Sequence, residues 1–152
     1  MDKGLADINA VAGVRGCITC DNRGGVIASV TPTGLDLATL NNIGRQVTLI
    51  LAALETAGQA MSELDFTYDG ARLVARDLGN AVLVVLCEPQ VEISMLRLTL
   101  NVVTARWKKD SSVQERLAGR AGEREDLLTK DNLDALSWLL LGSPGEPVAM
   151  AA

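Results

Sequence analysis

The chain has 152 residues and a net charge of −5, and nearly all of its apolar side chains are aliphatic. This length fits one domain, and the acidic balance argues against a nucleic-acid surface, which needs clustered lysine and arginine. The chain contains no histidine, so it lacks a Ser-His-Asp triad, a Cys-His pair and any imidazole metal ligand, and we do not expect an enzyme.

The cysteines and the hydropathy of the chain indicate where it works. No segment has the apolar run needed to span a membrane, and the first residues lack a secretory hydrophobic region, so we expect a cytoplasmic protein without membrane insertion. Cys17, Cys20 and Cys87 form an odd set that fits reduced thiols. A C-x-x-C pair on a helix can hold zinc or act in redox chemistry. On a strand, residues three apart point to opposite faces, so we expect no metal or cofactor here.

The first elements predicted in chain order are a short helix and a β-hairpin. The helix, Asp2–Val11, begins with an acidic N-cap candidate and has one apolar face, formed by Leu5, Ile8 and Val11. Arg15–Cys20 and Gly25–Thr31 are β-rich runs, and Asp-Asn-Arg-Gly-Gly between them is typical of a turn. Neither G-x-x-x-x-G-K-[ST] nor G-x-G-x-x-G occurs in the chain, so we expect no bound nucleotide.

A long helix is predicted over Asp36–Met61. Its apolar residues recur at alternating spacings of three and four, which places them on one side of the helix: Leu37, Leu40, Gly44, Val47, Leu51, Leu54, Gly58 and Met61. Further apolar rows lie beside them, formed by Ile43, Ile50 and Ala57 and by Leu49, Ala53 and Ala60. The helix is either sunk in its own core or packed on both its own sheet and a second subunit. The surplus rows favour the second subunit, because soluble monomers rarely expose so large an apolar patch. The two glycines on this side indicate close approach of another helix or strand.

Three strands and another helix follow. Leu64–Tyr68 and Arg72–Asp77 are joined by Asp-Gly, a strong hairpin signal, and Ala81–Cys87 reads as a central strand buried on both faces. Val91 to about Lys108 is amphipathic, with one apolar face formed by Ile93, Leu96, Leu100, Val103 and Trp107. This order predicts an α+β domain in which a single five-stranded, mainly antiparallel sheet is covered by helices on both faces, as in a three-layer, profilin-like fold.

We expect this domain to span residues 1–110. Residues 111–130 are highly charged with little apolar periodicity, which indicates a solvated helix or a mobile linker. Residues 131–142 are expected to form a short leucine-rich helix, and residues 143–152 a disordered tail. Because so short a helix is marginal in water, it should dock on its own domain or on a partner. Its candidate partner contacts are Leu136, Trp138 and Leu140.

Several short motifs follow one another along the chain in the order of these elements. They are L-x-x-I-x-x-V-x-G-V-x-G from Leu5, D-x-x-G-G-V-I-A-S from Asp21, Y-D-G-A-R-L-V from Tyr68, L-G-N-A-V-L-V-V-L from Leu78 and M-L-R-L-T-L from Met95. Together they resemble the Roadblock family of dynein light chains and bacterial or archaeal GTPase regulators, over residues 2–108. The charged segment and the leucine-rich helix lie outside the resemblance, which favours a bacterial regulator of the Mgl type.

The resemblance implies a homodimer in which the long helices pair and the sheets join edge to edge through the third strand. The expected interface is therefore Leu40, Ile43, Gly44, Val47, Ile50, Leu51, Leu54 and Gly58 of the helix, with Asp65 and Thr67 of the strand. It also implies a platform for a small Ras-like GTPase, with no catalytic residue or small-molecule substrate of its own. The alternative is an adaptor or scaffold subunit of a motor or signalling complex. Arg15 and Arg23 are either contacts to the GTPase or solvated hairpin arginines.

Overall fold

The computed structural model describes residues 1–31, 35–68, 70–118 and 128–129. Its elements are α1 (Asp2–Asn9), β1 (Val14–Cys20), β2 (Val26–Val30), α2 (Leu37–Thr56), β3 (Glu63–Tyr68), β4 (Ala71–Asp77), β5 (Val82–Cys87), α3 (Ile93–Lys109) and α4 (Ser111–Ala118). Each of the five predicted strands is present, and none of their ends differs from the predicted one by more than one residue. None of the described helices is long and apolar enough to cross a membrane.

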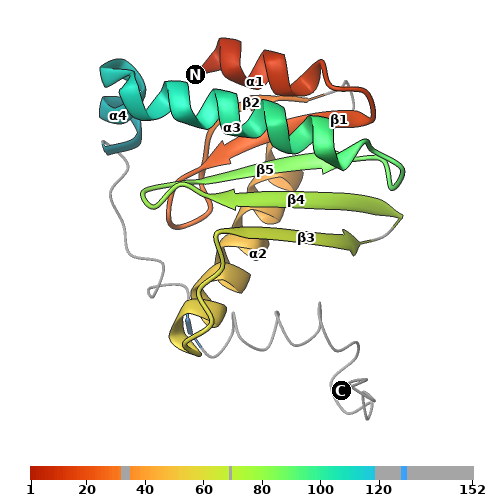
Figure 1. Ribbon diagram of the computed structural model, residues 1–152. Coiled ribbons are helices and arrows are strands. Elements are labelled where there is room, and N and C mark those ends of the chain that lie inside the picture. The colour runs from red at the N-terminus through yellow and green to blue at the C-terminus, as the bar shows by residue number, and fades with distance from the viewer. Residues whose placement is uncertain (32–34, 69, 119–127, 130–152) are drawn as a thin grey trace.

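The five strands form one sheet in the order β2-β1-β5-β4-β3, and every neighbouring pair is antiparallel. All residues of β5 are buried, which confirms the central strand expected from its aliphatic run. The sheet lies between α1 and α3 on one side and α2 on the other (Figure 1). The predicted fold class is confirmed: one antiparallel sheet with helices on both faces. The two edge strands are β2 and β3.

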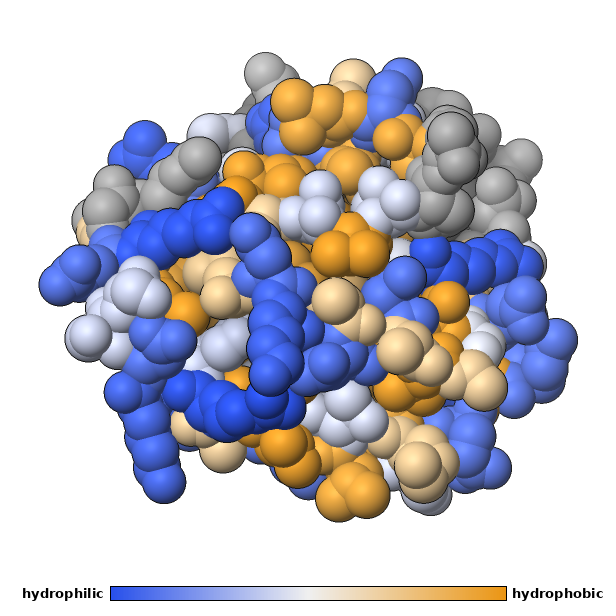
Figure 2. Space-filling view, turned by 90° about the horizontal axis from the view of Figure 1, so that it is seen from above, coloured by the Kyte–Doolittle hydropathy of each residue, from blue (hydrophilic) through white to orange (hydrophobic). Residues whose placement is uncertain are grey.

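Three helices cover one face of the sheet. Side chains from α1, α3 and α4 form a single apolar cluster with this face, which includes Leu5, Ile8, Cys17, Val85, Leu96, Leu100, Trp107, Val113 and Leu117. At Gly4 of α1, a Cβ atom would lie 2.6 Å from the indole nitrogen of Trp107, so the glycine permits α1 and α3 to pack closely. Outside this layer the surface mixes charged and apolar side chains (Figure 2), and Met95, Leu98 and Val102 of α3 are exposed there.

The charged segment after α3 contributes a packed helix to this same face. Val113 and Leu117 of α4 are both buried, at 2% exposure each, although the sequence around them is highly charged. The two residues are four apart and so share one side of the helix. This helix lies within residues 111–130, where a charged linker or helix is expected from the sequence.

The opposite face is covered by α2, which packs mainly on β1, β5 and β2. Leu40, Val47 and Leu51 point into an apolar cluster with the sheet residues Ile18, Cys20, Leu73, Ala75, Val82, Val84 and Leu86. Cys17 and Cys20 belong to the clusters on opposite faces, as predicted for residues three apart on a strand. At Gly44, an added Cβ atom would lie 2.9 Å from the carbonyl oxygen of Gly24 and would collide with the sulfur of Cys20. The close approach expected at this glycine is made by the β1–β2 hairpin of the same chain.

Several predicted helix ends are wrong: α1 ends at Asn9 and not at Val11, and α3 begins at Ile93 and not at Val91. The long helix ends at Thr56 and not at Met61, because Gly58 adopts a φ of +76° and the amides of Gly58 and Gln59 bond back to the carbonyls of Glu55 and Leu54. No described atom lies within 4 Å of a Cβ atom placed on Gly58, so this glycine ends the helix and makes no close contact with that part of the chain. At α1, Met1 occupies the N-cap position and no described side chain caps the helix, so Asp2 is not the cap.

Candidate protein-interaction site

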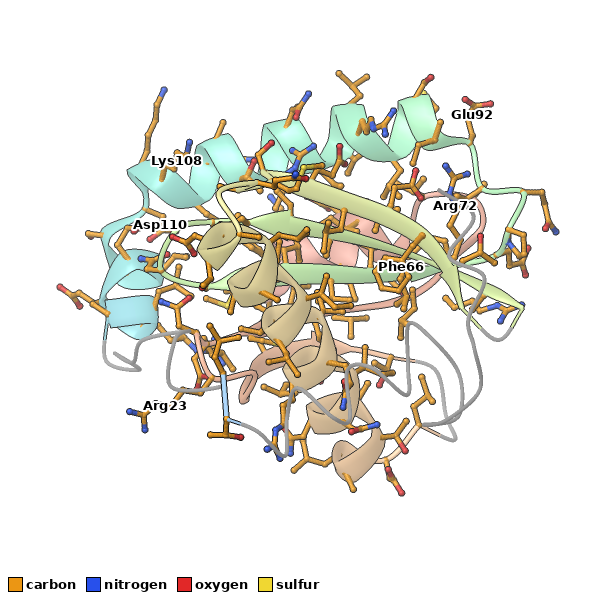
Figure 3. The ribbon with its side chains drawn as sticks, turned by 90° about the horizontal axis from the view of Figure 1, so that it is seen from below. Arg23, Phe66, Arg72, Glu92, Lys108 and Asp110 are labelled. Atoms are coloured by element: carbon orange, nitrogen blue, oxygen red, sulfur yellow. The ribbon has the colours of Figure 1, made fainter. Side chains whose placement is uncertain are left out.

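The face of the sheet that carries α2 has an apolar margin along β3 and β4. Leu64 and Phe66 of β3 pack against the core cluster on this side and are only partly buried, as is Ile43 of α2. We call Ile43, Leu64 and Phe66 the open margin. Figure 3, which views this face, shows Phe66 on the sheet beside α2. The open margin places half-buried apolar side chains next to the edge of the sheet.

The two edges of the sheet differ in how they are finished. At β2, the carbonyl oxygen of Ile27 accepts a hydrogen bond of 3.0 Å from Arg116 of α4, so a side chain already occupies part of that edge. At β3, the outward-facing backbone groups have no neighbouring strand among those that the structure describes. An edge strand of this kind is a template for pairing with another chain. This edge adjoins the open margin, because Leu64 and Phe66 belong to β3 itself.

The other side of β3 is charged and internally paired. Asp65 accepts hydrogen bonds of 2.8 and 2.6 Å from Arg72 of β4, and Arg97 of α3 lies 3.8 Å from the same carboxylate. Arg97 also lies 3.3 Å from a carboxylate oxygen of Glu63. The hydrogen bonds from Arg72 lower the pKa of Asp65 from its usual range. These pairs tie the edge strand to β4 and α3 and keep one side of it polar.

Solved structures identify the fold, although neither the family models nor the curated proteins include a match to this chain. A Roadblock/LC7 domain from Streptomyces avermitilis superposes with a TM-score of 0.63 at 14% identity, and the alignment covers 72% of this chain and 95% of that chain. The chain has the Roadblock/LC7 fold. At this identity, the similarity establishes the fold alone.

Two MglB structures share the Roadblock/LC7 fold of this chain. One, described as MglB with a tetrameric arrangement, superposes with a TM-score of 0.62 at 14% identity and covers 79% of this chain and 89% of that chain. The other, the gliding protein MglB from Thermus thermophilus, gives a TM-score of 0.59 at 17% identity with the same coverage. The suspected resemblance to Roadblock proteins of the Mgl type is therefore confirmed at the level of structure.

Within this Roadblock/LC7 fold, the residues predicted for the dimer interface separate into three groups. Leu40, Gly44, Val47 and Leu51 are buried in the core of their own chain. Ile43, Ile50 and Leu54 are half-buried on α2, while Gly58 lies beyond the end of that helix. Asp65 and Thr67 are exposed on the edge strand. Only the second and third groups are placed where a second copy could touch them.

Leu64 and Phe66 are site residues that the sequence reasoning missed. Both lie in β3, the strand predicted to join two copies, but the contacts predicted there are Asp65 and Thr67. The missed signal was the alternation Glu-Leu-Asp-Phe-Thr, which puts the two apolar side chains on one face and the polar ones on the other. The side chains at Leu64 and Phe66 are the apolar part of this edge.

The two arginines predicted as partner contacts are exposed but are not brought together. Arg15 lies near the start of β1, and Arg23 lies in the turn after its end. Arg23 borders an open pocket of about 390 Å³, which is lined by Arg23, Gly24, Gly25, Val26, Leu37, Asn41 and Arg45. The carboxylate of Asp21 orders this turn by accepting hydrogen bonds from the amides of Arg23 and Gly25 at 2.8 and 2.9 Å. The other predicted partner contacts, Leu136, Trp138 and Leu140, lie outside the described residues.

The three cysteines are buried and free. Burial raises the pKa of Cys17 and Cys20 to about 12 and that of Cys87 to about 11, so their thiols stay protonated at neutral pH. Cys17 donates a 3.2 Å hydrogen bond to the carbonyl oxygen of Leu5. Among the described residues, no group of three or more acidic or sulfur ligands could hold a metal ion. These cysteines serve as small core residues.

Proposed function

We propose that this protein is a dimeric, non-enzymatic platform that binds a small Ras-like GTPase and modulates its hydrolysis or its localisation. The observation that carries the proposal is the open margin of Ile43, Leu64 and Phe66 on a Roadblock/LC7 fold, beside the edge of β3, which has no neighbouring strand within the described part of the chain. Two copies that join through β3 would complete each other's sheet and cover both margins at once. The paired strands would form one continuous antiparallel sheet.

The geometry of the edge favours β3 over β2 as the joining strand. Arg116 already bonds the backbone at β2, whereas β3 has polar, paired side chains on one side and apolar, partly exposed side chains on the other. A stable interface usually buries about 1,200–2,000 Å² in total. Six residues of paired strand supply only part of this area, so the exposed side of α2, with Ile43, Ile50 and Leu54, has to contribute as well.

The choice of a GTPase as partner rests on the motifs and the fold together. The sequence resembles GTPase regulators of the Mgl type, and its structure is similar to two MglB structures. The chain has no histidine, and its thiols are buried and protonated. A protein of this kind acts by binding and repositioning groups of its partner, because it offers little acid–base or nucleophilic chemistry of its own.

Solution mass tests the dimer. Light scattering at increasing concentration should give twice the chain mass of 16.0 kDa for the unaltered protein. Phe66→Ser should shift the mass towards the monomer while the circular dichroism of the domain is preserved. Leu98→Ser is the matched control, since Leu98 is 57% exposed on α3, on the other face of the sheet. A stable monomer of the unaltered chain at high concentration would contradict the dimer.

State-dependent association tests the partner. The purified protein should bind a Ras-like GTPase of the same organism more tightly in one nucleotide state than in the other, as measured by calorimetry with GDP and with a slowly hydrolysed GTP analogue. Phe66→Ser should weaken this binding if the platform is the dimer. Absent or equal binding to both states for every Ras-like GTPase of that organism contradicts the proposal.

An adaptor role is the alternative, and the length of the chain favours it. The three superposed structures cover 72–79% of this chain, so part of its sequence lies beyond the shared fold. If that part binds an assembly partner, truncation after Ala118 abolishes complex formation and leaves the dimer intact. In that case, the rate of GTP hydrolysis by any bound GTPase is the same with and without this protein.

A further inference from the structure

The turn between β1 and β2 rests directly on α2. A Cβ atom on Gly24 would lie 2.7 Å from the amide nitrogen of Arg45 and would collide with the Cα atom of that residue. The amide of Val26, where β2 begins, donates a 3.1 Å hydrogen bond to the side-chain oxygen of Asn41, one helical turn before Arg45. These contacts place the turn and the first half of α2 side by side. The open pocket of about 390 Å³ that Arg23 borders is lined by residues of both, and we call it the hairpin pocket.

The hairpin pocket carries positive charge. Arg23 and Arg45, both exposed, contribute two guanidinium groups to its lining, and none of its described lining residues is acidic. Asp21, whose carboxylate orders the turn, adds one negative charge beside these two positive ones. The side-chain oxygen of Asn41 is taken by the backbone, which leaves the NH₂ group of the same amide as a further donor. In a chain whose net charge is −5, this local excess of positive charge favours an anionic ligand.

The backbone of the turn does not form a phosphate cradle. Glycine-rich turns bind phosphate through backbone N–H groups that point at the ligand. Here the four amides of residues 23–26 already donate hydrogen bonds within the chain, three to Asp21 and one to Asn41, at 2.8–3.1 Å. The anion therefore has to be held by side chains. The planar fork of a guanidinium group matches a carboxylate in a two-bond geometry, which makes a carboxylate a suitable anion.

The rest of the lining is partly apolar. Leu37, in the first turn of α2, is 63% exposed, and Val26 is half-buried. A ligand with an apolar group next to its carboxylate would cover this leucine while it binds the arginines. The volume of the pocket is typical of ligand sites, but the pocket is open, so it fits a segment that lies on the surface better than a free small molecule. An acidic residue beside an aliphatic one in an extended peptide offers both groups.

We propose that the hairpin pocket binds an acidic, aliphatic segment of a protein partner. Arg23 and Arg45 hold one carboxylate of the segment, and the neighbouring aliphatic side chain packs on Leu37 and Val26. None of the described lining residues belongs to the open margin or to the dimer interface expected from the sequence, so the site is separate from the surface assigned to a second copy. This binding requires neither the dimer nor a GTPase.

A pair of short peptides tests the site in the full-length protein. Acetyl-Glu-Leu-Glu-Leu-amide should shift the NMR signals of the Gly24 and Gly25 amides in a saturable manner, because both glycines line the pocket. Acetyl-Gln-Leu-Gln-Leu-amide has nearly the same shape without the charge and should bind about 10-fold more weakly, since the charge-assisted hydrogen bonds to arginine are lost. This comparison needs no substitution in the protein. Equal affinities for the two peptides overturn the proposal, as does the absence of saturable shifts at the two glycines with the acidic peptide.

Substitutions assign the binding to the arginines. Arg23→Ala and Arg45→Ala should each weaken binding of the acidic peptide by roughly 3-fold, a modest loss because exposed ion pairs are screened by solvent. Arg15→Ala is the matched control, since Arg15 is also exposed but does not line the pocket, and it should leave the affinity unchanged. Circular dichroism checks the fold of each variant. Unchanged affinity in both pocket variants overturns the assignment of the carboxylate to these arginines.

Small anions separate a peptide site from a general anion site. Acetate offers the carboxylate without the aliphatic neighbour and should bind roughly 10-fold more weakly than the acidic peptide. Leu37→Ser should weaken binding of the peptide by about 3-fold and leave that of acetate unchanged, because only the peptide covers the leucine. Inorganic phosphate that displaces the acidic peptide at equal concentration would make the hairpin pocket a site for free anions and overturn the proposal.

Discussion

The two faces of the sheet are built differently. On one face, α1, α3 and α4 close a continuous apolar cluster in which even the last helix buries Val113 and Leu117. On the other face a single helix covers mainly β1, β5 and β2 and leaves Leu64 and Phe66 partly buried at the edge. Figure 1 shows this contrast, with α1 and α3 above the sheet and α2 below it.

Under the proposed dimer, one face serves the stability of the fold and the other serves association. The three-helix face provides the well-packed core that a domain of this size needs to fold. The face under α2 has a core in its centre but keeps apolar side chains partly exposed at its margin. Their exposure costs a monomer little free energy, and their burial against a second surface would stabilise a complex. Substitutions on the two faces should therefore differ in size and in their dependence on protein concentration.

The largest effect is expected in the three-helix face. Leu100→Ala removes a fully buried side chain of α3 and should lower the free energy of unfolding by about 2–5 kcal/mol. Leu64→Ala in the open margin should cost roughly 1 kcal/mol in dilute solution, since this side chain is only partly buried. Urea unfolding at two protein concentrations measures both losses.

The concentration dependence tells the two faces apart. The loss caused by Leu64→Ala should grow as the protein is concentrated, because the unaltered chain then gains stability from association. The loss caused by Leu100→Ala should stay constant. An equal, concentration-independent loss at both positions would show that the two faces play the same part.

The next effect concerns the fit of α2 on the sheet. Gly44→Ala forces the helix away from the carbonyl oxygen of Gly24 and the sulfur of Cys20, and it should destabilise the domain by about 1–3 kcal/mol. Gly58→Asn is the control, since no described atom lies within 4 Å of a Cβ at that position and asparagine tolerates a positive φ. Thermal unfolding of both variants should show a large fall in Tm for the first and a small one for the second.

Most of the fold could be predicted because local signals and long-range packing agree. Asp-Asn-Arg-Gly-Gly and Asp-Gly mark hairpins, and a hairpin fixes both the direction and the neighbour of a strand. The run Ala81–Cys87 is apolar at every position but one thiol, which leaves no place for it except the centre of the sheet. The fold class followed from these three signals and from the periodicity of the helices.

The site was harder to predict because burial depends on what the chain does elsewhere. Leu40, Val47 and Leu51 have the same apolar pattern whether they meet a sheet or a second subunit, and only the structure shows that they meet the sheet. Nothing near Leu49 in the sequence indicates a contact with Leu128. The charged residues around Val113 and Leu117 likewise conceal a buried helix face.

A smaller effect is expected at the helix caps, one on each face. The carboxylate of Asp36 accepts a 2.7 Å hydrogen bond from the amide of Thr39 at the start of α2. The carboxylate of Asp110 accepts hydrogen bonds from the amides of Ser112 and Val113, in the first turn of α4, at 3.0 and 3.3 Å. Replacing either with alanine should lower Tm by ~3 °C, while serine in its place should keep Tm close to that of the unaltered chain, because its hydroxyl can also cap.

The caps also test which face matters for association. Asp36→Ala frays the first turn of α2 and should weaken the dimer as well as the fold. Asp110→Ala acts on the three-helix face and should leave the dimer unchanged. Differential scanning calorimetry gives the Tm, and light scattering gives the mass. Equal weakening of the dimer by both variants would contradict the assignment of association to the α2 face.

The smallest effect is expected at the ion pair on the polar side of β3. Arg72 lowers the pKa of Asp65 in the folded state, so the unfolded chain binds more protons at this site and stability rises with pH. The contribution is fully present above the unfolded pKa of about 3.9 and is lost as the pH falls through the lower folded pKa. Because both side chains of the pair are partly exposed to solvent, at 24% each, Asp65→Asn should cost less than about 1 kcal/mol at pH 6. Urea unfolding between pH 6 and pH 2.5 should show the difference in free energy of unfolding between the unaltered chain and Asp65→Asn shrinking in acid. A difference that stays constant down to pH 2.5 would mean that the carboxylate charge does not stabilise the edge strand.

If β3 joins a second copy, this difference should also persist in the dimer. Asp65 is bound to Arg72 on the side of the strand that faces α3, and not on the side of the open margin.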